Sequence, residues 1–408
     1  MVVTGFGVLA ANGIGSIVFW KTLLAGKSGI GPITLFDATT FPIRIAGEVK
    51  DFDLTRLVSG IAKPKRLGRH TQLALAAFQQ ALQHAQLSRE ILAAHAPVPI
   101  VVGVSTSAIE VIERGKDQMT AHGPSKVSSY IVSACQPHAV ATALAEIVGV
   151  PAQVETTSTA CPAGLNAINI AYQLVKSGKT ELAIAGGADA PITPLTVASF
   201  GATGMVPDWN DSPQKASRPF DRDRRGGILA EGAAFVVLEN LEYALARGMN
   251  PYLEILGYGN STDAPGTEPC SGLDASMAMA LANSARSAGD VDCVFAHGPS
   301  DPVIDRMETE AIKKVLGPRA YDIPVTSIKG VTGNPLAAAG PLQLISAALA
   351  VRDGLVPPTA NYEHRDPACD LDFVPGRARS TEINTALMNV HGLGGVNGSM
   401  VAQRVNGA

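Results

Sequence analysis

The sequence predicts an α/β fold in which helices cover the faces of a sheet. Short apolar runs rich in β-branched residues alternate with longer stretches rich in Ala and Leu, which is typical of strands followed by helices. The chain has 408 residues, of which 46% are hydrophobic and only 5% aromatic. A chain of this length can bury a large core, built mostly from Ala, Val, Ile and Leu, and we expect two domains or one large two-part fold.

The predicted strands are short apolar runs bounded by residues that interrupt a strand. Pro97 precedes the first run, and a Gly-Gly pair at 186–187 closes the second. The runs span 98–104, 182–185, 235–238, 252–257, 291–296 and 387–390. The stretches between them carry the Ala-rich and Leu-rich composition of helices and span 71–86, 138–148, 165–177, 277–288, 308–316 and 342–352.

No low-complexity linker divides the chain, and no short-period repeat is visible. The best candidate boundary lies around 247–251, where a Gly and a Pro follow a predicted strand and helix. We therefore predict a first half at 1–250 and a second half at 251–408.

Charge and cysteine content exclude several classes of protein. The formal net charge is −4, which indicates neither a nucleic-acid nor an anionic-membrane partner. No apolar run reaches the roughly 18 residues of a spanning helix, and the N-terminus lacks a signal-peptide pattern, so we expect a cytoplasmic protein. Five cysteines without CxxC spacing indicate neither a zinc cage nor a disulfide framework. Only 17% of residues are charged, which favours a surface partly covered by another subunit.

Cys161 carries the strongest chemical signal. A predicted strand at 154–157 leads into it, and Pro162 suits the first position of the following helix. A cysteine at a helix N-terminus is expected to have a lowered pKa, and its thiolate can attack a thioester carbonyl. From these residues alone two interpretations stay open, a nucleophile or a small buried hydrophobe.

A series of motifs favours the nucleophile. In chain order they are VTGxG from position 3, TACxxG from 159, AGGA from 185, SRPFD from 217, EGA from 231, AHG from 296, SxKxxxG from 327, AAG from 338, PPT from 357 and GGxNG from 394. Together they resemble the β-ketoacyl-acyl-carrier-protein synthases of the elongating, type I/II kind, over essentially the whole chain.

This resemblance implies the thiolase fold, with two similar halves in a five-layer α-β-α-β-α arrangement. It also implies a condensing acyltransferase that works on the phosphopantetheine arm of an acyl carrier protein and needs no separate cofactor. The acyl group would move to Cys161, and a malonyl thioester would lose CO₂ and attack it. The protein would form a homodimer, or a heterodimer with a related ketosynthase-like subunit.

Site residues follow from the matched motifs. The resemblance implies that Cys161 is the nucleophile and that its N–H and that of Leu393 form the oxyanion hole. It implies that His297 hydrogen-bonds the malonyl thioester oxygen and assists decarboxylation. It also implies that Lys329 stays ionised and supports the electrostatics around the second catalytic position. Asn334 occupies the position of the second catalytic His.

Several positions depart from the family pattern. Asn334 can donate a hydrogen bond but cannot titrate, although a Cys-His-Asn set resembles the initiating, type III branch. Pro299 and Asp301 replace threonines, and Asp301 would repel a malonyl carboxylate unless it points away or pairs with a cation. His391 and Gly227 replace pocket aromatics, which predicts a larger and more polar cavity.

Two further expectations concern ligands. A structural metal site of some members has Phe295 and Gln343 at its Asn and Glu positions, so we expect no metal. A basic cluster is a candidate contact for an acidic carrier protein, and it consists of Lys63, Lys65, Arg66 and Arg69.

Three functions remain to be weighed. The first is a ketosynthase with an unusual substrate, in polyketide or other specialised fatty-acid-like biosynthesis. The second is a non-elongating acyltransferase, which Asn334 and Asp301 favour because both should impair decarboxylation. The third is a chain-length-factor-like, non-catalytic subunit, against which the retained Cys161 counts.

Overall fold

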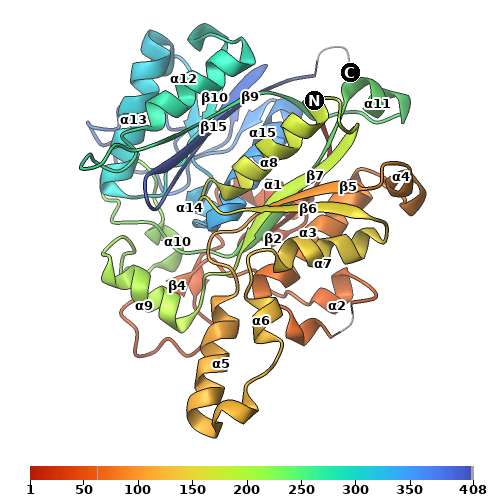
Figure 1. The fold of residues 1–408 in the computed structure, drawn as a ribbon. Helices are drawn as coiled ribbons and strands as arrows, with labels where there is room; N and C mark the ends of the chain where they lie inside the picture. The colour runs from red at the N-terminus through yellow and green to blue at the C-terminus, as the bar shows by residue number, and fades with distance from the viewer. Residues whose placement is uncertain (62, 406–408) are drawn as a thin grey trace.

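A computed structural model describes residues 1–61 and 63–405 (Figure 1). Its principal strands form one hydrogen-bonded path in the order β11-β10-β14-β15-β9-β1-β8-β7-β5-β6. The first five in this path belong to the second part of the chain, and the last five belong to the first part. The two groups meet where β1 pairs with β9 through Val2 and Val3.

The main elements of the first part are as follows. The strands are β1 Val2–Ala10, β5 Val98–Gly103, β6 Ala152–Thr157, β7 Leu182–Asp189 and β8 Gly232–Glu239. The helices are α3 Arg69–His84, α5 Ile109–His122, α6 Ile131–Ala134, α7 Ala139–Val148, α8 Ala163–Lys176, α9 Pro194–Ala202 and α11 Leu241–Ala246.

The second part contains a matching set. The strands are β9 Leu253–Thr262, β10 Cys293–Phe295, β11 Val325–Thr326, β14 Thr385–Gly392 and β15 Val396–Gln403. The helices are α12 Leu273–Ser284, α13 Pro302–Leu316, α14 Lys329–Thr332 and α15 Ala339–Asp353. The boundary expected at 250/251 falls in the connection between α11 and β9.

The two parts share one topology. Numbered along each part, the strands lie in space in the order 1-5-4-2-3 in both. β5 is parallel to β6 and β7, and β7 and β8 are antiparallel. In the second part β10 is parallel to β11 and β14, and β14 and β15 are antiparallel. The expected thiolase-type fold with two similar halves is therefore confirmed.

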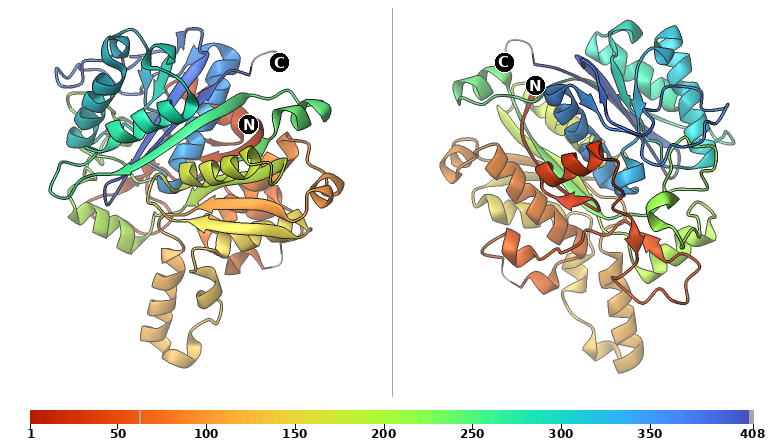
Figure 2. Two further views of the ribbon diagram at one scale, coloured as in Figure 1. Left: turned by 45° about the horizontal axis from the view of Figure 1, so that its top comes forward. Right: turned by 180° about the vertical axis from the view of Figure 1, so that it is seen from behind.

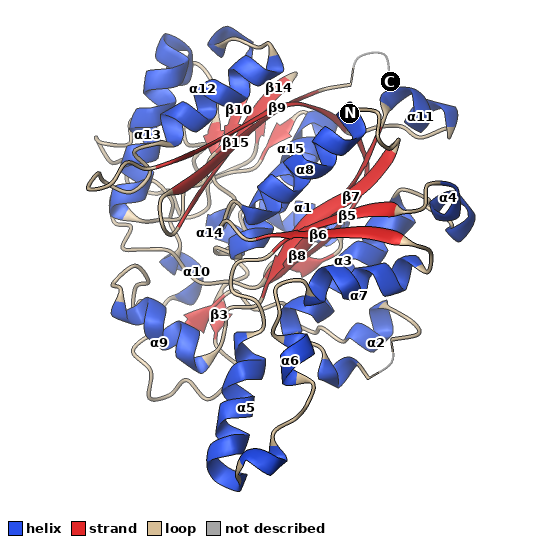
Figure 3. Ribbon diagram, viewed as in Figure 1, coloured by secondary structure: helices blue, strands red, loops and turns tan. Residues whose placement is uncertain are grey.

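The layers are visible in Figures 2 and 3. The two groups of strands act as two sheet layers, one from each part of the chain. Helices α8 and α15 lie between these layers, while α3 and α7 cover the outer face of the first and α12 and α13 cover the outer face of the second. The two central helices approach closely through glycine: a Cβ on Gly164 would come 2.1 Å from the Ala337 carbonyl oxygen, and one on Gly340 would come 2.7 Å from Leu165 Cβ. Only residues without a side chain allow this spacing.

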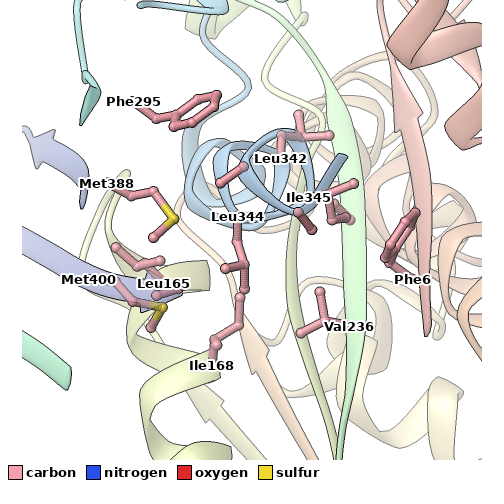
Figure 4. Close-up of a cluster of buried hydrophobic side chains, with 14 of the residues drawn as sticks. Phe6, Leu165, Ile168, Val236, Phe295, Leu342, Leu344, Ile345, Met388 and Met400 are labelled. Atoms are coloured by element: carbon pink, nitrogen blue, oxygen red, sulfur yellow. The ribbon is translucent and has the colours of Figure 1, made fainter. Parts of the chain in front are cut away.

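The largest buried cluster surrounds these central helices (Figure 4). Leu342, Leu344 and Ile345 of α15 lie between side chains from both sheets and from α8. The partners labelled in the figure are Phe6, Val236, Leu165, Ile168, Phe295, Met388 and Met400, all nearly fully buried. Because α15 is buried on every side, apolar residues occur all around this helix.

All predicted strands and helices are present, and the differences lie at their ends. β7 continues past the Gly-Gly pair because the bare backbone of Gly186 packs against β8, where a Cβ would meet the Ala234 carbonyl at 2.1 Å. α13 begins at Pro302, six residues earlier than predicted, because Asp301 caps it. Among the described residues, no helix combines the length and the apolar character needed to cross a membrane.

Candidate active site

Cys161 lies in the turn between β6 and α8. The helix begins at Ala163, so Pro162 precedes its first residue instead of occupying it. Ala160 has a φ of 55°, which places it in the left-handed region and turns the chain sharply before the cysteine. The Cys161 side chain is only 5% exposed.

The end of β14 packs directly onto this turn. A Cβ on Gly392 would lie 2.8 Å from Ala160 Cβ and 3.0 Å from the Cys161 nitrogen, so glycine is required for the approach. Leu393 follows, with its side chain half exposed. Neither the Cys161 nor the Leu393 N–H donates to an acceptor within the described part of the chain. Two free backbone donors are thus brought to one place, as an oxyanion hole requires.

His297 follows β10, and its tautomer is fixed by Lys329 of α14. Lys329 Nζ lies 3.0 Å from His297 Nδ1 and also donates to the His297 carbonyl oxygen. Burial lowers the pKa of Lys329 to about 8, so its ammonium persists at neutral pH and must donate to Nδ1. His297 therefore carries its proton on Nε2, and burial together with the Lys329 charge holds its pKa well below the usual range. His297 is a neutral hydrogen-bond donor.

Glu308 of α13 holds the backbone on which His297 sits. Its Oε1 accepts from the His297 N–H at 2.8 Å and its Oε2 from the Gly298 N–H at 2.7 Å. Glu308 was not predicted as a site residue from the sequence. A signal was present, because Glu308 shares the helical stripe of Ile304 and Ile312, where a charged side chain demands a buried partner.

Asn334 faces Cys161 from the loop before α15. Its Nδ2 lies 3.9 Å from Cys161 Sγ, whereas its Oδ1 is buried and has no partner in the parts of the chain that are described. The backbone of Asn334 is fixed by Ile228 at 2.8 Å and Ala230 at 3.0 Å. The amide is therefore positioned beside the sulfur without being saturated by hydrogen bonds.

The expected lowering of the Cys161 pKa is wrong. Burial raises it to about 11, although the Lys329 charge and the Asn334 amide act in the opposite direction. The helix end favours a thiolate, but removal of the sulfur from water disfavours it more. Cys161 is therefore a thiol at neutral pH.

One cavity of ≈ 510 Å³ unites the predicted site. Its lining includes Cys161, His297, Asn334 and Leu393 and the predicted pocket residues Gly227, Pro299, Asp301 and His391. Lys329 is absent from the lining because it is buried behind His297. Most other lining side chains are apolar, as is usual for a pocket that binds a small molecule.

Asp301 has two roles in this cavity. Its Oδ1 caps α13 by accepting from the Val303 and Ile304 N–H groups, both at 2.9 Å. The carboxylate nevertheless lines the cavity and acts electrostatically on His391. The carboxylate does not point away from the cavity, and it pairs with no cationic side chain among the described residues, so the helix end is what stabilises its negative charge.

The positions that resemble a metal site contain an amide instead. Gln343 Nε2 donates to the carbonyl oxygens of Ala296 at 2.7 Å, Asn389 at 3.1 Å and Phe295 at 3.5 Å. An amide N–H₂ thus occupies the place where carbonyl oxygens converge, and it is not a cation ligand.

Another group of possible ligands lies away from the cavity. Asp221, Asp223 and His364 place ligand atoms within 4.8 Å of one another. Asp221 is already engaged, since it accepts from Arg218 at 2.9 Å and from the Glu363 and His364 N–H groups.

The predicted basic cluster needs one correction. Arg69 is paired with the buried Glu231 at 2.6 Å and also donates to the Val49 carbonyl, so it is not available to a partner. Lys63, Lys65 and Arg66 are exposed, and Arg66 stacks on Tyr130 at 3.7 Å from the ring centre.

Comparison with known proteins assigns the family. The profile described as "Beta-ketoacyl synthase, N-terminal domain" matches residues 1–244, and that described as "Beta-ketoacyl synthase, C-terminal domain" matches 252–363. This chain belongs to the β-ketoacyl synthase family. A 3-oxoacyl-[acyl-carrier-protein] synthase 2 of Coxiella burnetii is 39% identical over 99% of this chain and 98% of the relative. The tetracenomycin polyketide synthase ketoacyl synthase alpha subunit of Streptomyces glaucescens is 38% identical over 99% and 97%.

Solved β-ketoacyl synthase structures superpose closely on this one. The ishigamide ketosynthase/chain length factor gives a TM-score of 0.92 at 31% identity, with 99% of each chain covered. A type II polyketide ketosynthase bound to a hexaketide, in complex with its acyl-carrier protein, gives 0.91 at 31% identity with the same coverage. Family membership identifies the chain as a condensing acyltransferase.

Proposed function

We propose that this enzyme loads an acyl group onto Cys161 and condenses it with a malonyl-type unit held on a carrier protein. The pathway would be polyketide or specialised fatty-acid-like biosynthesis in the cytoplasm. The observation that carries the proposal is the convergence, in one cavity, of a buried thiol, two free backbone N–H groups and an imidazole fixed as a donor.

Loading is a thioester exchange. Cys161 Sγ attacks the acyl carbonyl, and the Cys161 and Leu393 N–H groups stabilise the tetrahedral oxyanion. The bond to the pantetheine sulfur breaks, and the thiol proton leaves with that sulfur. Because the Cys161 pKa is raised, the sulfur enters the reaction as a thiol, and its proton is transferred to the departing pantetheine sulfur.

Condensation uses His297 and Lys329. The extender thioester oxygen accepts a hydrogen bond from His297 Nε2–H, which stabilises the enolate formed as CO₂ leaves. The Lys329 ammonium behind the ring adds to this stabilisation, since both the donated proton and the charge favour negative charge on that oxygen. The enolate carbon then attacks the acyl carbonyl and expels Cys161.

Two residues of the cavity favour the non-elongating acyltransferase as a second candidate function. Asn334 is 3.9 Å from the sulfur and cannot carry charge, and Asp301 places a carboxylate in the same cavity. Both features weaken a step that creates negative charge. In that case Cys161 would pass its acyl group to an amine, an alcohol or a second carrier.

Surface features support a dimer. β6 is the edge strand of the sheet, and its middle residues are exposed. β6 exposes Val154, and further exposed apolar side chains lie on α5, on α6 and in the connection between them, namely Ile112, Met119, Tyr130 and Val132. An unpaired apolar edge invites a second strand. We propose a homodimer, or a heterodimer with a ketosynthase-like subunit, joined at this face.

The exposed Lys63, Lys65 and Arg66 support the carrier protein as a partner. Lys126 at the end of the α5 connection is exposed as well. We propose that these four residues receive an acidic carrier helix. Arg69 has no part in this contact, because Glu231 neutralises it.

Intact-protein mass spectrometry with a panel of acyl-carrier thioesters tests the proposal. Wild type and Cys135→Ala, the matched control, should gain one acyl mass, and Cys161→Ala should gain none. Added malonyl carrier should then release CO₂ and a β-ketoacyl product. Acyl-Cys161 without CO₂ release from any extender would favour the non-elongating alternative, and Asn334→His should then gain elongation.

A further inference from the structure

His391 is held at the cavity by a chain of hydrogen bonds. Asn397 Nδ2 donates to Asp263 Oδ1 at 2.9 Å and to the Gly395 carbonyl at 3.2 Å. These bonds fix the orientation of the amide, so Asn397 Oδ1 accepts from His391 Nδ1 at 2.9 Å. His391 therefore carries its proton on Nδ1.

Asp263 anchors this chain. It accepts from the Cys270 and Gly272 N–H groups, both at 2.8 Å, so its carboxylate cannot swing away. The His391 ring is 5% exposed. Burial lowers its pKa despite the nearby carboxylates, which keeps the ring neutral at pH 7.

Nε2 of His391 is consequently a free acceptor. It makes no hydrogen bond with any residue in 1–61 or 63–405, yet it is not sealed from solvent-sized space, and the ring lines the cavity. The ring centre lies 6.0 Å from that of His297, edge to face. Two imidazoles thus present opposite groups to one space, a donor on His297 and an acceptor on His391.

One further acceptor shares this part of the cavity. Asp301 lines the cavity and its Oδ2 takes no part in the helix cap, whereas Asn334 Oδ1 is buried and closed to a ligand. The lining that the described residues form contains no Lys or Arg. His391 Nε2 and Asp301 Oδ2 are thus two acceptors that a malonyl group leaves without a donor, because the polar atoms of a malonyl group are themselves acceptors.

We propose that the preferred extender is a malonyl-type unit bearing an O–H or N–H donor on its central carbon, and that His391 Nε2 accepts this hydrogen bond. The inference rests on the proposed condensing function and names its substrate class. The thioester oxygen would accept from His297 while the substituent, on the adjacent carbon, donates to His391. Hydrogen bonds of about 2.9 Å at both ends are compatible with the 6.0 Å between the rings.

The test compares three extenders on the same carrier protein: malonyl, hydroxymalonyl and aminomalonyl. Acyl-loaded wild-type enzyme should release CO₂ from at least one substituted extender with a kcat/KM about 10-fold above that for malonyl, in line with one hydrogen bond to a well-placed group. Comparison of hydroxymalonyl with aminomalonyl shows whether His391 prefers an O–H or an N–H donor. His391→Phe should remove the preference, and His391→Gln, which keeps an acceptor, should restore part of it.

The outcomes separate this inference from the function on which it rests. Equal or better use of malonyl by the wild type, or an unchanged preference in His391→Phe, overturns the inference alone. A failure of Cys161 to load any acyl group would overturn the proposed function instead. Thermal unfolding of both variants should match the wild type, so that a loss of fold is not read as a loss of preference.

Discussion

The two halves of the molecule share a topology but divide the chemistry. In each half a strand, β6 or β11, is followed by the central helix, α8 or α15, and the connection between them carries residues of the candidate site. The first connection carries Cys161, and the second, which includes α14, carries Lys329 and Asn334. Cys161 and the Asn334 amide thus occupy corresponding places, and the close contact of α8 with α15 brings them together.

A second correspondence lies at the ends of β5 and β10. After β5, the buried Asp189 accepts from the Ser105 and Thr106 N–H groups at 3.0 and 2.8 Å. After β10, Glu308 accepts from His297 and Gly298 at 2.8 and 2.7 Å. A carboxylate clamps the same turn in both halves, but only the second turn carries an imidazole. The clamp serves the fold, and the side chain placed on it gives the function.

The largest expected effects come from substituting Cys161 and Asn334, the residues at corresponding places in the two halves. Cys161→Ala should lower acyl transfer at least about 1,000-fold, because no other group can form the thioester. Asn334→Ala should lower condensation only about 10-fold, since it removes one neutral hydrogen bond. Rates of product formation under saturating carrier measure both. Comparable losses in the two variants would show that the amide is as necessary as the thiol.

The next largest effect is expected from substituting Glu308, the carboxylate that holds the turn at His297. Glu308→Gln should lower CO₂ release about 100-fold, because an amide can accept only one of the two N–H bonds and His297 shifts. Acyl loading of Cys161 should change less than about threefold, since His297 has no part in it.

A pH profile distinguishes positioning from a merely structural role at Glu308. Its charge raises the pKa of Lys329, so the alkaline limb of the Glu308→Gln profile should move to lower pH. Equal losses in loading and condensation, with no such shift, would argue against the positioning role.

The pKa of Lys329 predicts how the condensation rate of the wild-type enzyme depends on pH. Its pKa is about 8, so below that pH the ammonium donates to His297 Nδ1 and keeps the proton on Nε2. As pH rises through about 8 the ammonium is lost, the tautomer is released and condensation should fall several-fold. Stopped-flow rates of CO₂ release between pH 6 and 9.5 measure this. A rate that keeps rising across that range would contradict it.

The smallest effect should come from the glycines that join the halves. Gly164→Ala and Gly340→Ala should each lower the free energy of unfolding by about 1–3 kcal/mol, because the added methyl overpacks the α8–α15 contact. Gly289→Ala is the matched control, with its nearest neighbour at 3.7 Å, and should stay within about 0.5 kcal/mol. Denaturant unfolding compares the three. Equal effects would mean that the helix contact can relax.

The sequence was most informative where a signal is local. Alternation of apolar runs predicted the strands and helices, and the sequence around Cys161 predicted that the cysteine lies between a strand and a helix. The raised pKa of that thiol was not predicted, because helix-end arguments consider the dipole and omit burial. Arg69 was assigned to a surface cluster because its partner, Glu231, lies 162 residues away. Glu308 and the Asp263–Asn397–His391 chain depend on similarly distant contacts.

The packing of β14 against the nucleophile turn also sets an order in time. Cys161 precedes Asn334 by 173 residues, and the Leu393 N–H comes later still. During synthesis the cysteine therefore leaves the ribosome long before the groups that we propose stabilise its oxyanion. No nascent chain that ends before β14 contains the Leu393 N–H, so on the proposed mechanism we expect thioester chemistry to begin only when the last two strands have joined the sheet.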